Sequence, residues 1–228
     1  SSGASDVGDA SLRDAAGMPS WAFILLQDRL STDGSFMLGD ADVTHEGYVM
    51  RFVSPGFAEL YGYLPSECVG LRCCACMALQ TEDFLHLAKT VDMELQMVKD
   101  SIHCIQAYVV QEAIREQTDS TPGFALLLER NKDGSLIVCE VMVSTQTHPA
   151  NGWRYSLCLQ TRSDVSIIQI LEAGLAGGGY AELVRDRHER MIARLAASHI
   201  DVSAAHLYAE EKIMDVWAGM FAELNIDW

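Results

Sequence analysis

The sequence predicts an α+β fold with a five-stranded antiparallel sheet, its helices on one face, a long helical insertion and a C-terminal helical hairpin. Three observations support this prediction. Apolar or β-prone runs separated by turn residues occur in two groups, one before residue 54 and one after residue 123. Residues 81–117 contain no Gly and no Pro and repeat apolar residues at heptad spacing. Amphipathic helical patterns fill the last third of the chain.

The first group predicts a strand pair that leads into a short helix. Residues 36–38 and 48–53 are the two strands, and the turn-forming residues 42–47 lie between them. Gly62 ends the helix that follows. That helix is indicated by apolar residues at i, i+3 and i+4, namely Phe57, Leu60 and Tyr61.

The second group predicts the remaining three strands. Residues 124–130 form the first of them, and the turn around Asp133 and Gly134 leads into the second. Residues 136–144 and 153–161 supply the last two strands.

The insertion at 81–117 predicts one unusually long helix, or two helices with a break near Ser101. We considered two interpretations, a core-facing helix that wraps its own sheet and a spine that docks another helix of this chain or of a partner. For the second interpretation, Leu95, Val98, Ile102 and Ile105 are the candidate contact residues. The complete apolar seam is Phe84, Ala88, Val91, Leu95, Val98, Ile102, Ile105 and Val109.

The last third predicts a helical extension over 167–228. A short apolar helix at 167–176 is broken by three glycines, and an amphipathic helix follows at 180–198. A last helix carries Trp217 and Phe221, which we consider further candidate partner contacts. Its apolar face is Ile213, Val216, Trp217, Met220, Phe221 and Leu224.

Bulk properties exclude some functions and favour others. A formal net charge of −16 argues against binding a nucleic-acid backbone, which needs a basic surface. No run of about 18 apolar residues exists that could span a membrane. Seven cysteines, an odd number in a chain with ample core, favour reduced thiols in an intracellular, soluble protein. The chain begins at Ser1 and not at Met, which fits a fragment or a processed protein. Location in an organelle, after removal of a targeting peptide, therefore remains an alternative.

A pattern of spaced residues matches a known family. The matched positions are Ser54, Phe57, Gly62, Tyr63, Glu67, Gly70 and Cys73. This segment resembles a PAS domain of the light-oxygen-voltage (LOV) type, and Cys74-Ala75-Cys76 is also similar to the PAS domains of ether-à-go-go potassium channels. The resemblance covers 36–166, which leaves 1–35 as a lead-in and cap.

The resemblance implies a flavin site, because LOV photoreceptors bind a flavin and form a thioether between it and one cysteine under blue light. Cys73 stands at that cysteine's position. Elsewhere this sequence departs from the family: Arg72 replaces an Asn, Cys74 an Arg and Met77 a Gln, although Gln80 lies one turn further on. Two Asn positions correspond to Glu129 and Cys139, and the last Gln is kept. The implied cofactor-binding residues are therefore Cys73, Arg72, Met77, Gln80, Glu129, Cys139 and Gln160.

The cysteine cluster also suggests metal or redox chemistry. Structural zinc needs four ligands, and the cluster of Cys73, Cys74 and Cys76 supplies only half of such a site. Cys68 and Cys104 could complete it, but their spacing does not require this. We therefore predict no metal. A redox-active thiol needs a lowered pKa, which Arg72 or a helix start could provide beside Cys73.

Three functions remain open. The leading interpretation is a non-enzymatic PAS/LOV-like regulatory or assembly module without a cofactor, which contacts a protein partner or a second copy through its helices, as part of a larger complex. The alternative is a blue-light flavoprotein with FMN and a Cys73 adduct. The second alternative is a redox or small-ligand sensor, whose cavity would be lined by Gln160 and an apolar wall of Leu126, Leu128, Val141 and Val143.

Overall fold

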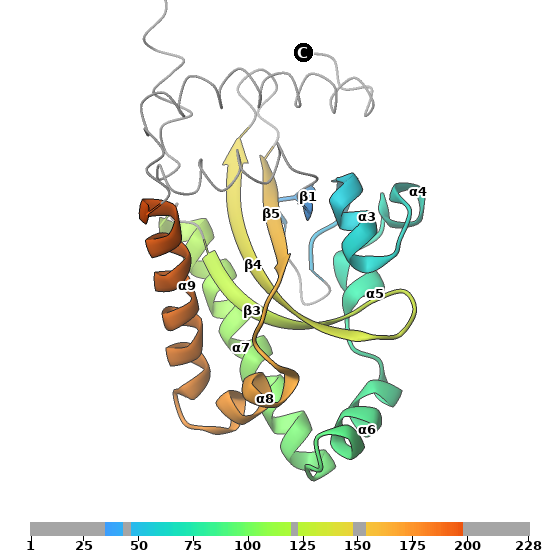
Figure 1. The fold of residues 1–228 in the computed structure, drawn as a ribbon. Coiled ribbons are helices and arrows are strands. Elements are labelled where there is room, and N and C mark those ends of the chain that lie inside the picture. Colours follow the sequence, from blue (N-terminus) through green and yellow to red (C-terminus); the bar gives the residue numbers. More distant parts are fainter. Residues whose placement is uncertain (1–34, 43–46, 120–122, 148–153, 198–228) are drawn as a thin grey trace, which may run out of the picture.

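The computed structural model describes residues 35–42, 47–119, 123–147 and 154–197, and it contains one five-stranded antiparallel sheet (Figure 1). The strands lie side by side in the order β2-β1-β5-β4-β3. The predicted α+β class and five-stranded antiparallel sheet are confirmed. The strands are β1 Ser35–Asp40, β2 Met50–Val53, β3 Gly123–Arg130, β4 Leu136–Thr147 and β5 Arg154–Arg162.

Two groups of helices accompany this sheet. Of the helices in the described residues, five connect β2 to β3 and two follow β5. The connecting helices are α3 Pro55–Tyr61, α4 Pro65–Cys68, α5 Cys73–Met77, α6 Thr81–Thr90 and α7 Leu95–Asp119. The later helices are α8 Ile167–Leu175 and α9 Gly179–Ala197.

Helix α3 begins and ends where the sequence predicts. The Ser54 hydroxyl accepts a hydrogen bond from the Phe57 N–H, Pro55 occupies the first turn, and Gly62 ends the helix at a φ of 77°. The same hydroxyl accepts from the Phe36 N–H at 2.9 Å, so the start of the helix is fixed to β1.

The sheet is covered by helices on both faces, which corrects the expectation of helices on one face only. Strand β5 illustrates the division, because Leu157 and Leu159 face one core while Cys158 faces the other. Helices α3, α4 and α5 pack in the core that contains Cys158. Helices α6, α7, α8 and α9 contribute to the core that contains Leu157. Nearly continuous apolar strands follow from this arrangement, since neither face is left to solvent.

The long insertion forms two helices, and the break lies at 91–94 and not near Ser101. Asp92 adopts a positive φ of 52°, which an Asp tolerates better than most residues. A sequence without Gly or Pro gives no signal for such a break. Ser101 lies in the middle of α7, in contact with α8.

The heptad seam of α7 packs inside the chain. Val98, Ile102 and Ile105 are buried in the core together with residues of α8, and Leu95 is half-buried. Of the two interpretations, the core-facing one therefore applies to Val98, Ile102 and Ile105, because these side chains do not lie on an open surface.

Helices α7 and α8 cross at very close range. The Ser101 hydroxyl donates to the Leu171 carbonyl oxygen at 2.7 Å. Gly174 permits the approach, because a Cβ atom there would lie 2.9 Å from the Ser101 carbonyl oxygen. The helix of the insertion and the first helix of the C-terminal extension thus form one packed unit.

Helix α9 is held to the sheet by two polar contacts. Arg187 forms an ion pair with Glu140 of β4 at 2.6 Å and a second one with Asp164. The Tyr180 hydroxyl accepts from the Leu126 N–H at 3.2 Å and donates to the carbonyl oxygen of the same residue. Trp217 and Phe221 lie outside the described residues.

At the other edge of the sheet, β2 meets the segment before α5. Val49 and Arg72 form an isolated antiparallel bridge, the Met50 N–H donates to the Leu71 carbonyl oxygen at 2.8 Å, and the Gly70 N–H donates to the Met50 carbonyl oxygen at 2.7 Å. Among the helices described, none combines the length and the apolar character needed to cross a membrane.

Candidate functional site

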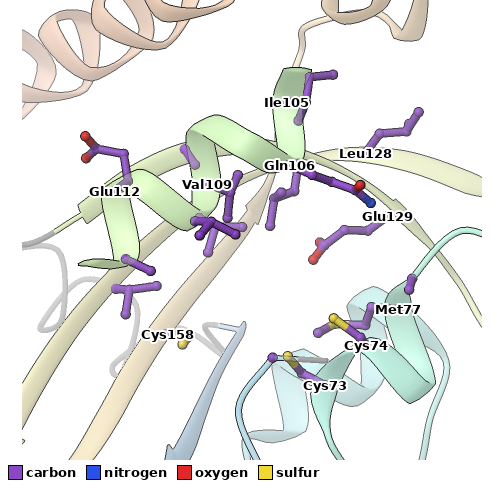
Figure 2. A pocket seen from close by; sticks show the side chains of 18 of the residues that line it. Cys73, Cys74, Met77, Ile105, Gln106, Val109, Glu112, Leu128, Glu129 and Cys158 are labelled. Atoms are coloured by element: carbon purple, nitrogen blue, oxygen red, sulfur yellow. The ribbon is translucent and has the colours of Figure 1, made fainter. Parts of the chain in front are cut away.

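A cavity of about 740 Å³ lies between the sheet, α5 and the middle of α7 (Figure 2). This volume is within the range of small-molecule sites, which is roughly 300–1,000 Å³. Most of the lining is apolar: Met77 comes from α5, Val143 from the sheet, and Ile105 and Val109 from α7. The candidate functional site is therefore a partly open cavity with one long helix as a wall.

The cavity exists because α7 is fixed at both ends and does not collapse onto α5. Near its start, Ser101 contacts α8, as described above. Near its end, both carboxylate oxygens of Glu116 accept hydrogen bonds from Thr145 of β4, one from its N–H and one from its hydroxyl at 2.7 Å. The Gln117 side chain also donates to the Ala41 carbonyl oxygen at 3.0 Å.

The most unusual polar group of the lining is the carboxyl of Glu129 on β3. It is buried and accepts hydrogen bonds from the Tyr61 hydroxyl and the Cys139 thiol. Burial raises the pKa of Glu129, and the two hydrogen bonds oppose this effect. Figure 2 shows the Gln106 side chain of α7 extending over the cavity toward Glu129.

The cysteines beside the cavity are held as thiols. A hydrogen bond with Cys74, followed by burial, raises the pKa of Cys73 well above its usual range. Burial also raises the pKa of Cys158. The guanidinium of Arg72 donates to the Gly47 carbonyl oxygen at 2.9 Å. The raised pKa of Cys73 disfavours the hypothesis of a low-pKa redox thiol at this position.

The predicted flavin residues divide into three groups. Cys73, Met77 and Glu129 line the cavity. Two others are buried in the structure without being part of the lining, namely Cys139 and Gln160. The last two lie elsewhere: Arg72 contacts Gly47, and Gln80 is the N-cap residue of α6, with its side chain donating to the Ala78 carbonyl oxygen at 3.2 Å.

Gln160 lies directly behind the lining. Its Nε2 atom is 3.9 Å from the Met77 Sδ atom, and its Oε1 atom has no hydrogen-bond partner among the described residues. Of the apolar wall expected near it, Leu128, Val141 and Val143 do line the cavity. Leu126 is buried in the core that contains Leu157 and is not part of the lining, which corrects that expectation.

Sequence reasoning missed the parts of the site that depend on distant contacts. Tyr61 was predicted only as a core residue, and its hydrogen bond to Glu129 joins positions 68 residues apart. Gln106 of the lining lies off the apolar seam, so the heptad pattern gave no signal for it.

The lining residues do not fit a flavin mononucleotide. A carboxyl, Glu129, stands where the resemblance requires an amide to read the edge of the ring. Among the described residues that line the cavity, none is Lys or Arg, so neither an ammonium nor a guanidinium group is there to bind the phosphate.

Metal ligands do not gather in the part of the chain that the structure describes. Among its His, Cys, Asp and Glu residues, no three lie together in a way that could hold a metal ion.

The strand order, the helices between β2 and β3, and the cavity between α5 and the sheet give the chain a PAS-type fold, as the resemblance predicted.

Solved LOV and PAS domains are similar to this chain. A light-oxygen-voltage domain from a study of its mechanism with a flavin analogue is 16% identical over 75% of this chain and 99% of its own, with a TM-score of 0.43. The aureochrome LOV domain in its light state is 15% identical over 72% and 98%, with a TM-score of 0.40. The PAS-B domain of Drosophila melanogaster Cycle with bound glycerol is 13% identical over 57% and 99%, with a TM-score of 0.38.

These likenesses are too distant to bear on ligand or activity, and the fold assignment rests on the topology of the chain itself. No family model and no curated protein matches the sequence.

Proposed function

We propose that this chain is a PAS-type regulatory module, not an enzyme, that takes up a small and mainly apolar molecule in the cavity and passes the event on through α7. The observation that carries the proposal is that α7 forms a wall of the cavity and also packs in the core that contains Leu157. Ile105 illustrates this dual position, because it lines the cavity and belongs to the cluster that includes α8.

The contact between α7 and α8 gives this proposal a physical route. A ligand that shifts α7 by a fraction of an ångström also shifts Ser101, which is in close contact with Gly174 of α8. Tightly packed helices respond to such shifts by moving together, because their interface has little free volume. Helix α8 would then carry the change toward α9, which packs against it.

The state of the polar groups supports a non-enzymatic role. The raised pKa values of Cys73 and Cys158 leave these thiols weak nucleophiles at neutral pH. Glu129 is engaged by the hydroxyl of Tyr61 and the thiol of Cys139. These groups suit recognition of a ligand better than bond-breaking chemistry.

The test combines ligand uptake with hydrogen exchange. The purified 228-residue chain is screened by thermal shift against small apolar compounds, and a Val109→Trp variant, which fills the cavity, serves as the control. We expect binders to lose affinity in the variant and to change amide exchange in α8. Binding that leaves the exchange of α8 unchanged would remove the regulatory part of the proposal, and absence of any binder would remove the rest.

A flavin photoreceptor is the second candidate, because the Cys73 thiol lies in the cavity wall. The misfit of Glu129 and the lack of a lining cation weigh against it. An absorption spectrum of the native protein in the dark and after blue light decides the matter. A three-peaked flavin band that bleaches in the parent and not in Cys73→Ala would establish this function, and a colourless protein after FMN supplementation would exclude it.

Contacts with a protein partner or a second copy remain part of the proposed function. Since Val98, Ile102 and Ile105 are occupied inside the chain, we assign such contacts to the segment that the sequence predicts as a last helix, with Trp217 and Phe221. Light scattering of the 228-residue chain and of its double Trp217→Ala, Phe221→Ala variant tests this assignment. A parent chain that is already monomeric, or an oligomer that survives both substitutions, would contradict it for self-association.

A further inference from the structure

The cavity has an acidic lining. Among the described lining residues, two carry carboxylates, Glu112 and Glu129, and none is Lys or Arg. The chain as a whole has a formal net charge of −16, which adds to the negative potential. The one lining histidine among the described residues, His103, is exposed to solvent. An anionic ligand therefore meets two carboxylates and no lysine or arginine of the described lining.

The two carboxylates differ in whether they are already paired. Glu112 lies on α7 and forms an ion pair with Arg115 at 2.7 Å. None of the described residues forms an ion pair with Glu129, which accepts hydrogen bonds only from the neutral groups of Tyr61 and Cys139. A carboxylate has about four acceptor sites, so two bonds leave Glu129 with capacity for a donor from the cavity.

We infer that the cavity selects a mainly apolar amine, whose positively charged nitrogen binds the Glu129 carboxylate while its apolar part contacts Val109, Val143 and Met77. This inference rests on the proposed function, because it names the ligand class of the same cavity. A buried carboxylate without a cation is costly, and a protonated amine on the ligand supplies the missing charge. A buried carboxylic acid on the ligand would instead place two like charges together.

Other features of the cavity agree with this ligand class. Burial raises the pKa of Glu129, and a neighbouring ammonium group would oppose that shift by favouring the ionised carboxylate. The Gln106 side chain extends over the same end of the cavity and offers an amide oxygen as a second acceptor for an N–H group (Figure 2). Both acceptors therefore lie at one end, and the remaining wall is apolar.

Three probes of matched size and shape test the inference on the unmodified chain. They are naphthylmethylamine, naphthalenemethanol and naphthoate, which are cationic, neutral and anionic at neutral pH. Dissociation constants are measured by isothermal titration at about 0.15 M salt, where interactions with distant surface charges are screened. We expect the amine to bind about 10- to 100-fold more tightly than naphthoate, the range expected for one charged hydrogen bond in a buried site.

Variants locate the preference at one carboxylate. Glu129→Gln keeps the size of the side chain and removes its charge, and we expect it to abolish the preference for the amine. Glu112→Gln is the matched control, since that carboxylate is already paired with Arg115. Val109→Trp fills the cavity and is expected to weaken all three probes.

Each outcome has one meaning. Comparable binding of the three probes, or tightest binding of naphthoate, would overturn the inference and leave the proposed ligand-binding function intact. An amine preference that persists in Glu129→Gln and is lost in Glu112→Gln would also overturn it. Absence of binding by every probe, together with no binder in the thermal-shift screen, would remove the proposed function itself. The comparison on the unmodified chain can overturn the inference even if Glu129→Gln fails to fold.

Discussion

The crossing of α7 and α8 gives a quantitative prediction for Gly174→Ala. A Cβ atom at this position would lie 2.9 Å from the carbonyl oxygen of Ser101, 3.1 Å from its Cα atom, and in still closer contact with its hydroxyl oxygen. Rotation of the hydroxyl relieves only the last of these contacts. The backbone atoms of α7 cannot rotate away, so the two helices must separate.

The change in the free energy of unfolding combines two destabilising contributions and one stabilising contribution. Overpacking of a tight interface costs about 1–3 kcal/mol. Loss of the hydrogen bond from Ser101 to Leu171 costs about 1 kcal/mol more. Alanine stabilises a helix by about 1 kcal/mol relative to glycine, which offsets the lost hydrogen bond. We therefore expect the free energy of unfolding to fall by about 1–3 kcal/mol.

Urea unfolding followed by circular dichroism measures this change. Gly177→Ala is the matched control, because a Cβ atom there would have no neighbour within 4 Å, and we expect it to be nearly neutral. A Gly174→Ala protein as stable as the parent, or more stable through its better helix propensity, would refute the reasoning. It would mean that α7 and α8 separate at no cost.

Three further predictions concern buried polar groups. Glu116→Ala removes both acceptors of Thr145, and urea unfolding should show a loss of about 2 kcal/mol, with a smaller loss in Glu116→Gln. Alkylation by iodoacetamide at neutral pH should modify the exposed Cys104 at least about tenfold faster than Cys73, whose raised pKa and burial limit its thiolate. For Glu129, the folded-state pKa is raised, so the unfolded chain releases its proton first as the pH rises. The stability that this group contributes is full below about pH 4.3 and falls as the pH rises toward its folded-state pKa. In urea unfolding from about pH 4 to 7, Glu129→Gln should lack this fall.

Each of these predictions has a contrary result. Equal stability of the parent and Glu116→Ala would mean that the end of α7 is not held by Thr145. Peptide mapping that finds Cys73 alkylated as fast as Cys104 would contradict a buried, protonated thiol. Parallel pH profiles of the parent and Glu129→Gln would show that this carboxyl titrates alike in the folded and unfolded chain.

Local signals in the sequence were sufficient to predict most strands of the sheet and helix α3. The predicted strand 153–161 matches β5 to within one residue, and Gly62 adopts the positive φ expected at the end of α3. These features depend on neighbours in the sequence, since side-chain alternation, caps and turn residues act within a few positions.

The site required information that is not local. The break at 91–94 depends on how α6 and α7 pack, because no Gly or Pro marks it. The cavity depends on Glu116 and Ser101 fixing α7 at positions far from α5. The sequence placed Glu129 in the site through the family resemblance, but its partner Tyr61 is 68 residues away. Such pairings arise from the tertiary structure and leave no periodic pattern.

The Tyr180 hydroxyl has a consequence for how this sheet meets other molecules. By bonding both the N–H and the carbonyl oxygen of Leu126, it occupies part of the place that a neighbouring strand would take beside β3. At the opposite edge, residues 70–72 do the same for β2. With helices over both faces, the described sheet offers little backbone for strand addition, the route by which exposed edges recruit partners or aggregate. Loss of this one hydroxyl, as in Tyr180→Phe, would leave the backbone groups of Leu126 at the margin of β3 without these two hydrogen bonds, and we expect the chain to become more prone to edge-to-edge association.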